Sequence, residues 1–162
     1  MNKDKILREQ LQSLLKGGNA HMTFLEMIKD FPLEKINTIF PNGTYSPWHL
    51  LEHLRISQWD ILDFIKNPEY KYMEWPKDYW PSERKKADKN EWEKTIELFE
   101  KDSEELRKIV KNPKTDLYKK IPWGEGQTIL REILLTCDHS AYHIGEFAIM
   151  RQVMKTWGKN HR

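Results

Sequence analysis

The sequence contains little that would suit a secreted or membrane protein. Cys137 is the only cysteine among 162 residues, so no disulfide can form within the chain. No apolar run approaches the roughly 18 residues that a membrane-spanning helix needs. The N-terminal stretch MNKDKILREQ carries charges throughout and lacks the apolar centre of a signal peptide. We therefore expect a protein that resides in the cytoplasm and has no membrane partner.

An excess of charge of one sign is also missing. The chain has 27 basic and 25 acidic residues, for a formal net charge of +2 at pH 7, and the two kinds are interleaved. Nucleic-acid-binding proteins more often carry a one-signed basic stripe. The longest basic clusters, at 84–86 and 119–120, are short and typical of solvated loops. These observations argue against a nucleic-acid partner.

Length and composition indicate one globular domain that spans residues 1–162. A chain of this size buries roughly 70% of its unfolded surface, so it needs neither a disulfide nor a metal to fold. Hydrophobic residues make up 38% of the chain and charged residues 32%, with seven tryptophans. This aromatic content exceeds what a four-helix core needs, which is compatible with a homodimer.

Several segments show the apolar spacing of amphipathic helices. They cover residues 3–16, 23–30, 47–66, 88–110 and 128–158. We interpret the first two as one helix interrupted by a Gly-Gly pair, which leaves four helices. Ser46 with Pro47 predicts the start of the second helix, and Asp88 with Glu91 predicts the start of the third. Because no alternating pattern with hairpin turns occurs, we predict an all-α fold, a four-helix bundle with one long crossover connection.

The segment YKYMEWPKDYWP, residues 70–81, connects the second and third of these helices. Its aromatic residues and prolines indicate an ordered connection and not a flexible linker. Two interpretations stay open. The segment either packs over one end of the bundle, or it forms a wall or lid over a pocket.

Two histidines lie four residues apart in the stretch DHSAYHIGE, residues 138–146. Because residues i and i+4 share a helix face, His139 and His143 point the same way, and Glu146 joins the same stripe. Two imidazoles and a carboxylate suit a first-row divalent metal. The alternative is a pair of structural histidines that are satisfied within the core.

A second pair of histidines lies in HLLEH, residues 49–53. His53 shares a stripe with apolar positions, which points it inward, whereas His49 in the first turn is expected closer to solvent. A site built from His53, His139 and His143 would leave one or more positions open for water or substrate. Open positions are typical of catalytic metal sites.

The string HLLEH also matches the H-x-x-E-H pattern of inverted zinc peptidases. In that case His49 and His53 would bind zinc, and Glu52 would act as the general base. Such an enzyme needs a peptide cleft, for which four helices leave little room. It would also leave His139 and His143 without a role.

Further side chains are candidates for supporting roles. Glu146, Asp60 and His49 are candidates for a fourth ligand, or for an outer partner that orients a ligand imidazole. His21 belongs either to a pocket mouth or to a loop cap. Tyr142 belongs either to packing or to a pocket contact.

Taken together, these motifs resemble the DinB-like superfamily. The resemblance covers nearly the whole chain after about residue 17, in the segments GGNAHMTF at 17–24, PWHLLEHLRISQWDILDF at 47–64, WPKDYWP at 75–81, GEGQTILRE at 124–132 and DHSAYHIGE at 138–146. The last segment is the most specific, because the fourth helix of the family typically carries H-x-x-x-H followed by a Gly and a Gln. Here Ser140 stands where Asn is common and Glu146 where Gln is common, and neither change removes a ligand.

The resemblance implies a bundle that holds one divalent metal ion through His53, His139 and His143. Zinc or nickel is expected ahead of manganese or iron. Known activities of the family include metal-dependent transferases and isomerases that use low-molecular-weight thiols. The implied function is therefore a thiol transferase, or a hydrolase, that acts on a small-molecule substrate, and no catalytic residue is assigned. The alternative is a non-catalytic bundle that binds a metal or small ligand as a sensor or stress protein.

Overall fold

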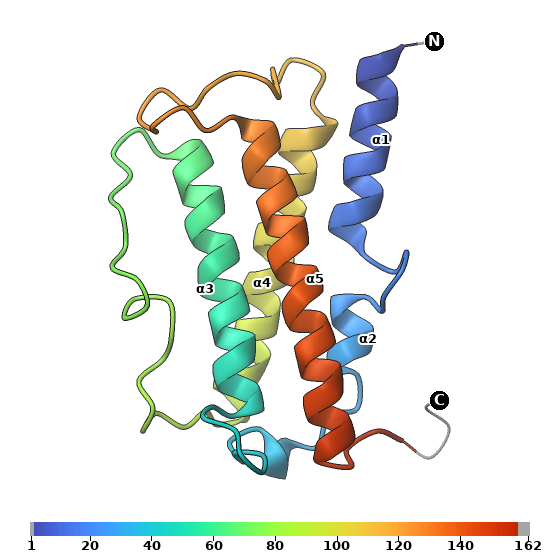
Figure 1. The fold of residues 1–162 in the computed structure, drawn as a ribbon, viewed down its shortest axis with the longest axis vertical. Coiled ribbons are helices and arrows are strands. Elements are labelled where there is room, and N and C mark those ends of the chain that lie inside the picture. Colours follow the sequence, from blue (N-terminus) through green and yellow to red (C-terminus); the bar gives the residue numbers. More distant parts are fainter. Residues whose placement is uncertain (1, 159–162) are drawn as a thin grey trace.

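Five α-helices make up most of the described part of the protein, and Figure 1 shows their arrangement. The computed structural model describes residues 2–158. Its helices are α1 (Lys3–Lys16), α2 (Phe24–Ile28), α3 (Pro47–Lys66), α4 (Lys89–Lys111) and α5 (Ile129–Val153), with a 3-10 turn, η1 (Leu33–Lys35), before α3. Residues 2–158 contain no β-strand, only an isolated bridge between Lys120 and Thr128. The predicted all-α class is confirmed. No helix within this range is long and apolar enough to cross a membrane.

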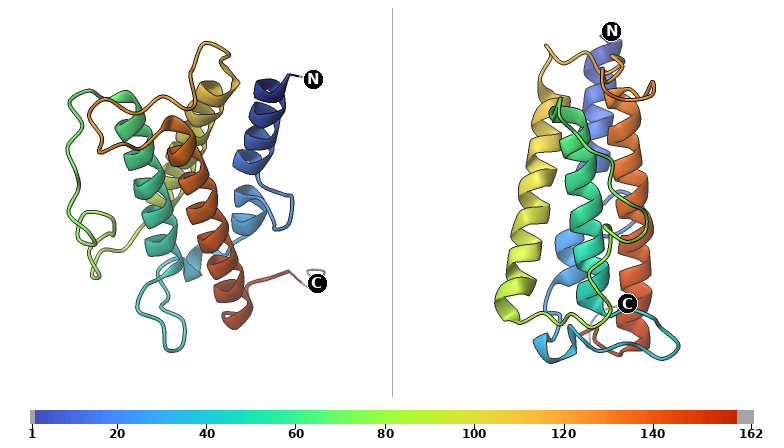
Figure 2. Two further views of the ribbon diagram at one scale, coloured as in Figure 1. Left: turned by 45° about the horizontal axis from the view of Figure 1, so that its top comes forward. Right: turned by 90° about the vertical axis from the view of Figure 1, so that its left-hand side faces the viewer.

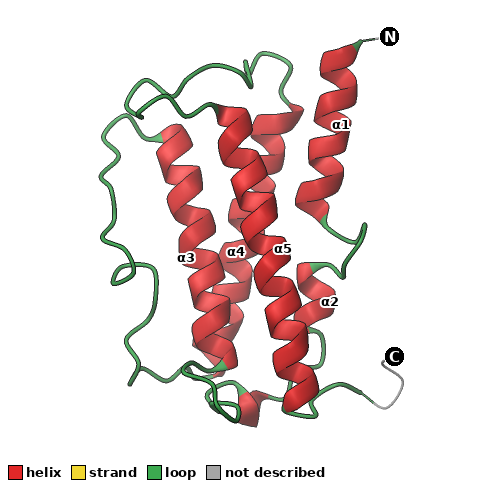
Figure 3. Ribbon diagram, viewed as in Figure 1, coloured by secondary structure: helices red, strands yellow, loops and turns green. Residues whose placement is uncertain are grey.

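The long helices lie side by side, and the direction of each one explains the longest connection. α3 packs against α4 and α5, and α1 packs against the same two helices. α3 and α4 run in the same direction, whereas α1 and α5 run the opposite way (Figures 1 and 2). A parallel pair needs a connection that returns along the whole length of a helix. Residues 67–88 make that return along α3 (Figure 3).

Side-chain caps set the starts of the three longest helices. Ser46 caps α3 and Pro47 occupies its first turn. Asp88 caps α4 in a complete capping box with Glu91, and Thr128 caps α5. Each such cap stabilises its helix by about 1 kcal/mol, because it satisfies backbone N–H groups that have no partner within the helix. The predicted starts of all three helices are confirmed.

Two predicted helical segments are shorter in the structure than in the sequence analysis. The segment predicted at 23–30 is helical only over Phe24–Ile28, after the cap residue Thr23. The last helix, predicted to reach about residue 158, ends at Val153. Lys155 adopts a left-handed backbone with a φ of 55°. A left-handed residue cannot continue an α-helix, so the chain turns back there.

The interior has two apolar clusters separated by a polar layer. One cluster contains Trp48 and Phe147, and the other contains Leu106 and Ile133. Between them α3, α4 and α5 all contribute buried polar side chains. We call this set the polar layer: His53, Ser57, Gln58, Asp102, Ser103, Thr136 and His143. Because a buried polar group is costly unless it is hydrogen-bonded, such a layer in a small protein points to function more than to stability.

Candidate metal centre

Three histidines from two helices meet on one side of the polar layer. Nε2 of His53 on α3 lies 3.2 Å from Nε2 of His143 and 3.2 Å from Nε2 of His139, both on α5. The three ligand atoms all lie within 4.8 Å of one another. His53 and His143 are buried, and His139 is partly buried. The predicted grouping of these three side chains is therefore present in the structure.

The outer nitrogens of two of these rings are held by hydrogen bonds. His53 donates from Nδ1 to the backbone carbonyl oxygen of Tyr79, at 2.9 Å. His143 donates from Nδ1 to Oε2 of Glu146, at 2.6 Å. A neutral imidazole that carries its proton on Nδ1 has a lone pair on Nε2. Both hydrogen bonds therefore direct an Nε2 lone pair toward the centre of the group, as the outer partners of metal-binding histidines do.

Burial keeps the three imidazoles neutral at pH 7. Desolvation, followed by the nearby His53, lowers the pKa of His139 to about 4. Desolvation and then the two neighbouring histidines lower the pKa of His143, and desolvation lowers the pKa of His53. Only a neutral imidazole can bind a metal ion. The site is thus already in the protonation state that a cation requires.

The two nitrogen separations from His53 fit a first-row metal ion. A tetrahedral site with metal–nitrogen bonds of about 2.0 Å places its ligands about 3.3 Å apart. The two Nε2 separations of 3.2 Å match that value. The Nε2 lone pairs of His53 and His143 also cannot satisfy each other, because both rings carry their proton on Nδ1. The residues present therefore fit a divalent cation with at least one coordination position left for another ligand.

Residues 67–88 form a wall beside this site. Trp80 stacks on the ring of His53 with centroids 4.0 Å apart and planes 4° from parallel. The more exposed ring of Trp75 lies 6.3 Å from the same imidazole. These ring contacts agree with the second interpretation of the aromatic connection, in which it forms a wall over the site. Sequence reasoning did not identify Trp80 or the Tyr79 carbonyl as partners of His53.

Asp60 acts on the site indirectly. Its carboxylate accepts hydrogen bonds from the hydroxyls of Tyr70, at 2.8 Å, and Tyr79, at 2.7 Å. Burial, followed by the hydrogen bond to this carboxylate, raises the pKa of both phenols above the ordinary range. The predicted direct contact with a ligand imidazole is not among the hydrogen bonds of Asp60. Instead, Asp60 anchors Tyr79, and the carbonyl of Tyr79 in turn holds His53.

Glu146 lies behind His143, where it accepts two hydrogen bonds. Oε2 accepts from His143, and Oε1 accepts from the hydroxyl of Tyr45. Burial raises the pKa of this carboxyl group. With both oxygens engaged, Glu146 is placed as the outer partner of a ligand and not as a fourth ligand. Tyr45 is a member of the site that sequence reasoning missed.

The other candidate residues lie outside the histidine group. His49 was predicted to be near solvent, and this was wrong. Its ring is 7% exposed, with Nδ1 bound to Ser46 and Nε2 donating to the carbonyl of Ser82. The ring is buried because residues 67–88 pass over the first turn of α3. His21 is exposed and bonds the carbonyl of its neighbour Met22.

Tyr142 is 70% exposed, but its ring centroid lies 4.8 Å from that of His143. The ring therefore borders the site on the solvent side.

Glu52, the general base of the peptidase alternative, accepts hydrogen bonds from Arg55 and Thr95. Both of its oxygens, and both ring nitrogens of His49, are thus committed to structural contacts.

Comparison with known proteins agrees with this arrangement. A sequence model described as the DinB superfamily matches residues 19–147. The matched range includes α2, α3, α4 and the part of α5 that carries His139 and His143. Searches of curated proteins and of solved structures returned no match.

Proposed function

The chain belongs to the DinB superfamily, and we propose that it is a divalent-metal-dependent enzyme that transfers a low-molecular-weight thiol. His53, His139 and His143 would hold the metal ion. The observation that carries the proposal is the convergence of three imidazoles, in which Nε2 of His53 lies 3.2 Å from Nε2 of both His139 and His143. The rings of His53 and His143 are fixed at Nδ1. We take the side-by-side helices as the four-helix bundle of the family, with residues 67–88 as its crossover.

Zinc or nickel is the proposed occupant, with manganese or iron as further candidates. Imidazole nitrogens suit zinc, nickel and iron, whereas manganese prefers oxygen ligands. Such an ion lowers the pKa of a coordinated thiol or water and so supplies a nucleophile at neutral pH.

The protein's own side chains would orient the reactants and restrict water. Glu146 and the carbonyl of Tyr79 hold the imidazoles in the orientation that binding requires. The rings of Trp75 and Tyr142, 67% and 70% exposed, lie beside His53 and His143 on the solvent side. Apolar rings at that place offer a surface for the carbon skeleton of a thiol or of its electrophilic partner. No charged group among the metal-binding residues selects one thiol, so the substrate class is a small thiol in general.

A metal measurement tests the binding half of the proposal. Elemental analysis of untagged wild-type protein should find about one equivalent of zinc or nickel, and His139→Ala should lose it. His21→Ala is the matched control, because its ring is exposed and lies outside the histidine group. The proposal fails at this step if wild-type protein stays free of metal after incubation with zinc, nickel and manganese salts.

A conjugation assay tests the catalytic half. Cysteine and 1-chloro-2,4-dinitrobenzene form a carbon–sulfur bond with release of chloride and a proton, which gives an absorbance change. Saturation in both substrates, lost in His139→Ala and kept in Glu97→Ala, an exposed carboxylate outside both sites, would support a thiol transferase. Metal binding without any saturable turnover across several thiols and electrophiles would instead favour the sensor alternative.

A further inference from the structure

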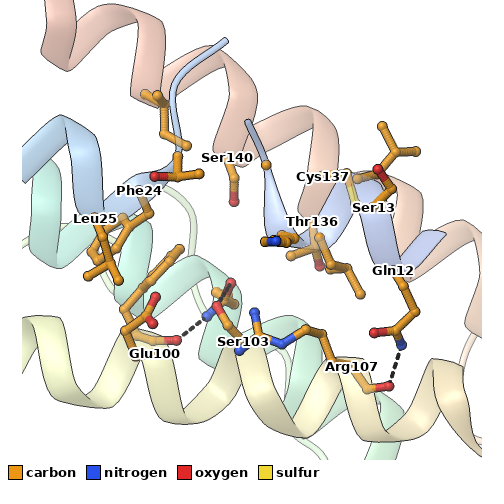
Figure 4. A pocket seen from close by; sticks show the side chains of 18 of the residues that line it. Gln12, Ser13, Phe24, Leu25, Glu100, Ser103, Arg107, Thr136, Cys137 and Ser140 are labelled. Carbon is orange, nitrogen blue, oxygen red and sulfur yellow. Dashed lines mark hydrogen bonds between the residues drawn. The ribbon is translucent and has the colours of Figure 1, made fainter. Parts of the chain in front are cut away.

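A cavity opens on the other side of the polar layer from the metal centre. It has a volume of about 650 Å³ and is lined by residues of all five helices and of the connection between α1 and α2 (Figure 4). None of the three clustered histidines lines it. The volume falls within the range of about 300–1,000 Å³ that small-molecule pockets occupy. The cavity is therefore a binding-site candidate separate from the metal centre.

The inner wall of this cavity is polar where a core would be apolar. Gln58, Ser103 and Thr136 line it and are 4%, 6% and 3% exposed. Gln58 donates from Nε2 to the carbonyl of Phe99 at 2.8 Å and accepts from Ser103 at 3.1 Å. An amide has two donor hydrogens and two acceptor lone pairs, so each half of Gln58 keeps capacity for one more partner. The hydroxyls of Ser103 and Thr136 already donate, to Gln58 and to the carbonyl of Glu132, so the second N–H of Gln58 is the donor that this wall offers a ligand.

A cation lies beside these groups. Figure 4 shows the side chain of Arg107 extending along α4 toward Ser103. Its Nε donates to Glu104 at 2.9 Å. The two terminal nitrogens of the guanidinium group take no part in this contact. Lys16 adds a second positive charge to the lining, against the single carboxylate of Glu100. The carboxylate of Glu104 lies outside the lining and already pairs with Nε of Arg107. The terminal nitrogens of the guanidinium group can still bind a ligand carboxylate in the two-point geometry that suits it.

The remaining walls are apolar. Phe24 of α2 stacks on Phe99 of α4 with ring centroids 3.9 Å apart. Leu15, Leu25 and Ile144 complete this side. An apolar chain or ring would be shielded from water there, with its charged end directed toward Arg107.

The break between α1 and α2 forms one border of this cavity. Gly17 and Gly18 have φ values of 72° and 78°, a backbone that other residues rarely adopt. Gly17, His21 and Thr23 of the connection all line the cavity. Gly17 and His21, which contribute nothing to the metal centre, therefore border this cavity.

We propose that this cavity binds a small amphipathic carboxylic acid. The carboxylate pairs with the terminal nitrogens of Arg107 and accepts a hydrogen bond from the second N–H of Gln58, and the apolar body lies against Phe24, Leu25 and Ile144. The proposal stands independently of the activity at the metal centre.

Calorimetric titration with decanoate tests the proposal, with decanol as a probe of the same length that lacks the carboxylate. Wild-type protein should bind decanoate at one site, at least tenfold more tightly than decanol. Arg107→Gln should remove most of that preference, and Arg84→Gln, an exposed arginine outside the cavity, should keep it. Absence of saturable decanoate binding, or equal affinity for decanoate and decanol, would overturn the proposal.

Two further measurements test whether decanoate binds in this cavity. His139→Ala should bind decanoate as wild type does, and a loss there would place the acid at the metal centre and contradict the proposal. Cys137 lines the cavity and is the only cysteine. Its alkylation by N-ethylmaleimide, followed by mass spectrometry of wild-type protein, should be slowed severalfold by saturating decanoate. An unchanged rate would show that the acid binds elsewhere, whether or not Arg107→Gln folds.

Discussion

Nδ1 of His143 lies 2.6 Å from Oε2 of Glu146, almost one helical turn further along α5. The two residues belong to the same helix, so their contact needs no particular packing of another element. The hydroxyl of Tyr45 holds the other oxygen of the same carboxylate. A chain of three side chains thus fixes the orientation of one candidate ligand.

Glu146→Ala should weaken zinc binding by about 10–100-fold, the usual cost of removing the outer partner of a metal-binding histidine. Glu146→Gln should weaken it less, because an amide oxygen can still accept the hydrogen bond from His143. Competition with a chromophoric chelator measures both affinities. Glu97→Ala, an exposed carboxylate on α4, is the control. Equal zinc affinity for wild type and Glu146→Ala would show that this carboxylate does not orient the ligand.

Asp60→Ala should loosen residues 67–88 and weaken the metal site at the same time. The change removes the acceptor for two phenol hydroxyls and leaves both phenols without their partner. A lost hydrogen bond to a charged group costs about 1.5–3 kcal/mol of the free energy of unfolding. Urea unfolding should show a loss of at least that size, and chelator competition should show a lower zinc affinity.

Asp63→Ala is the matched control for that experiment. Asp63 lies on the same helix and accepts a side-chain hydrogen bond only from its near neighbour Asn67 among the described residues. Its removal should change neither zinc affinity nor stability by more than about 0.5 kcal/mol, as for most surface substitutions. If Asp60→Ala loses stability but binds zinc as wild type does, the Tyr79 carbonyl does not support His53.

The sequence was sufficient to predict the features that depend on local spacing. Caps at Ser46, Asp88 and Thr128 determine the helix starts, and the i,i+4 pair determines the shared face of two histidines. The path of residues 67–88 depends instead on tertiary contacts. The partner of His53 is a backbone carbonyl, which every residue has, so no side-chain pattern could reveal it. The burial of His49 also depends on the path of residues 67–88, so the sequence could not reveal it.

The cavity beside Arg107 could also not be predicted from the sequence. Its polar wall combines Gln58, Ser103 and Thr136, one residue from each of three helices. Each of these residue types is common on exposed helix surfaces, and none has a periodic signature. Only the packing of α3, α4 and α5 brings them to one wall.

Stability of the metal-free protein should fall as pH is lowered from about 6.5 toward 4. The pKa of His139 is about 4 in the folded protein, against an ordinary value of 6.5. Between these values the unfolded chain binds a proton that the folded protein does not, so unfolding is favoured. Above pH 6.5 both states are neutral, and this contribution does not vary.

Thermal melts in EDTA at a series of pH values measure this effect, with His139→Gln as the comparison. Glu146 acts in the opposite direction, because burial raises its pKa and protonation then favours the folded state. That carboxylate is present in both proteins, so the difference between the two pH profiles isolates His139. A wild-type profile no steeper than that of His139→Gln between pH 6.5 and 4 would contradict the prediction.

His49→Ala and His143→Ala should separate the metal centre from the inverted-peptidase alternative. Both ring nitrogens of His49 are engaged, one with Ser46 and one with the carbonyl of Ser82. The loss of His49 should therefore cost about 1–3 kcal/mol of the free energy of unfolding through unsatisfied buried partners, and leave zinc binding intact. His143→Ala should instead lose the bound zinc, because it removes one of the three converging imidazoles. Elemental analysis and urea unfolding of the same two preparations give both quantities. An inverted zinc peptidase would lose its metal in His49→Ala and keep it in His143→Ala, so the two interpretations predict opposite results from the same pair of proteins.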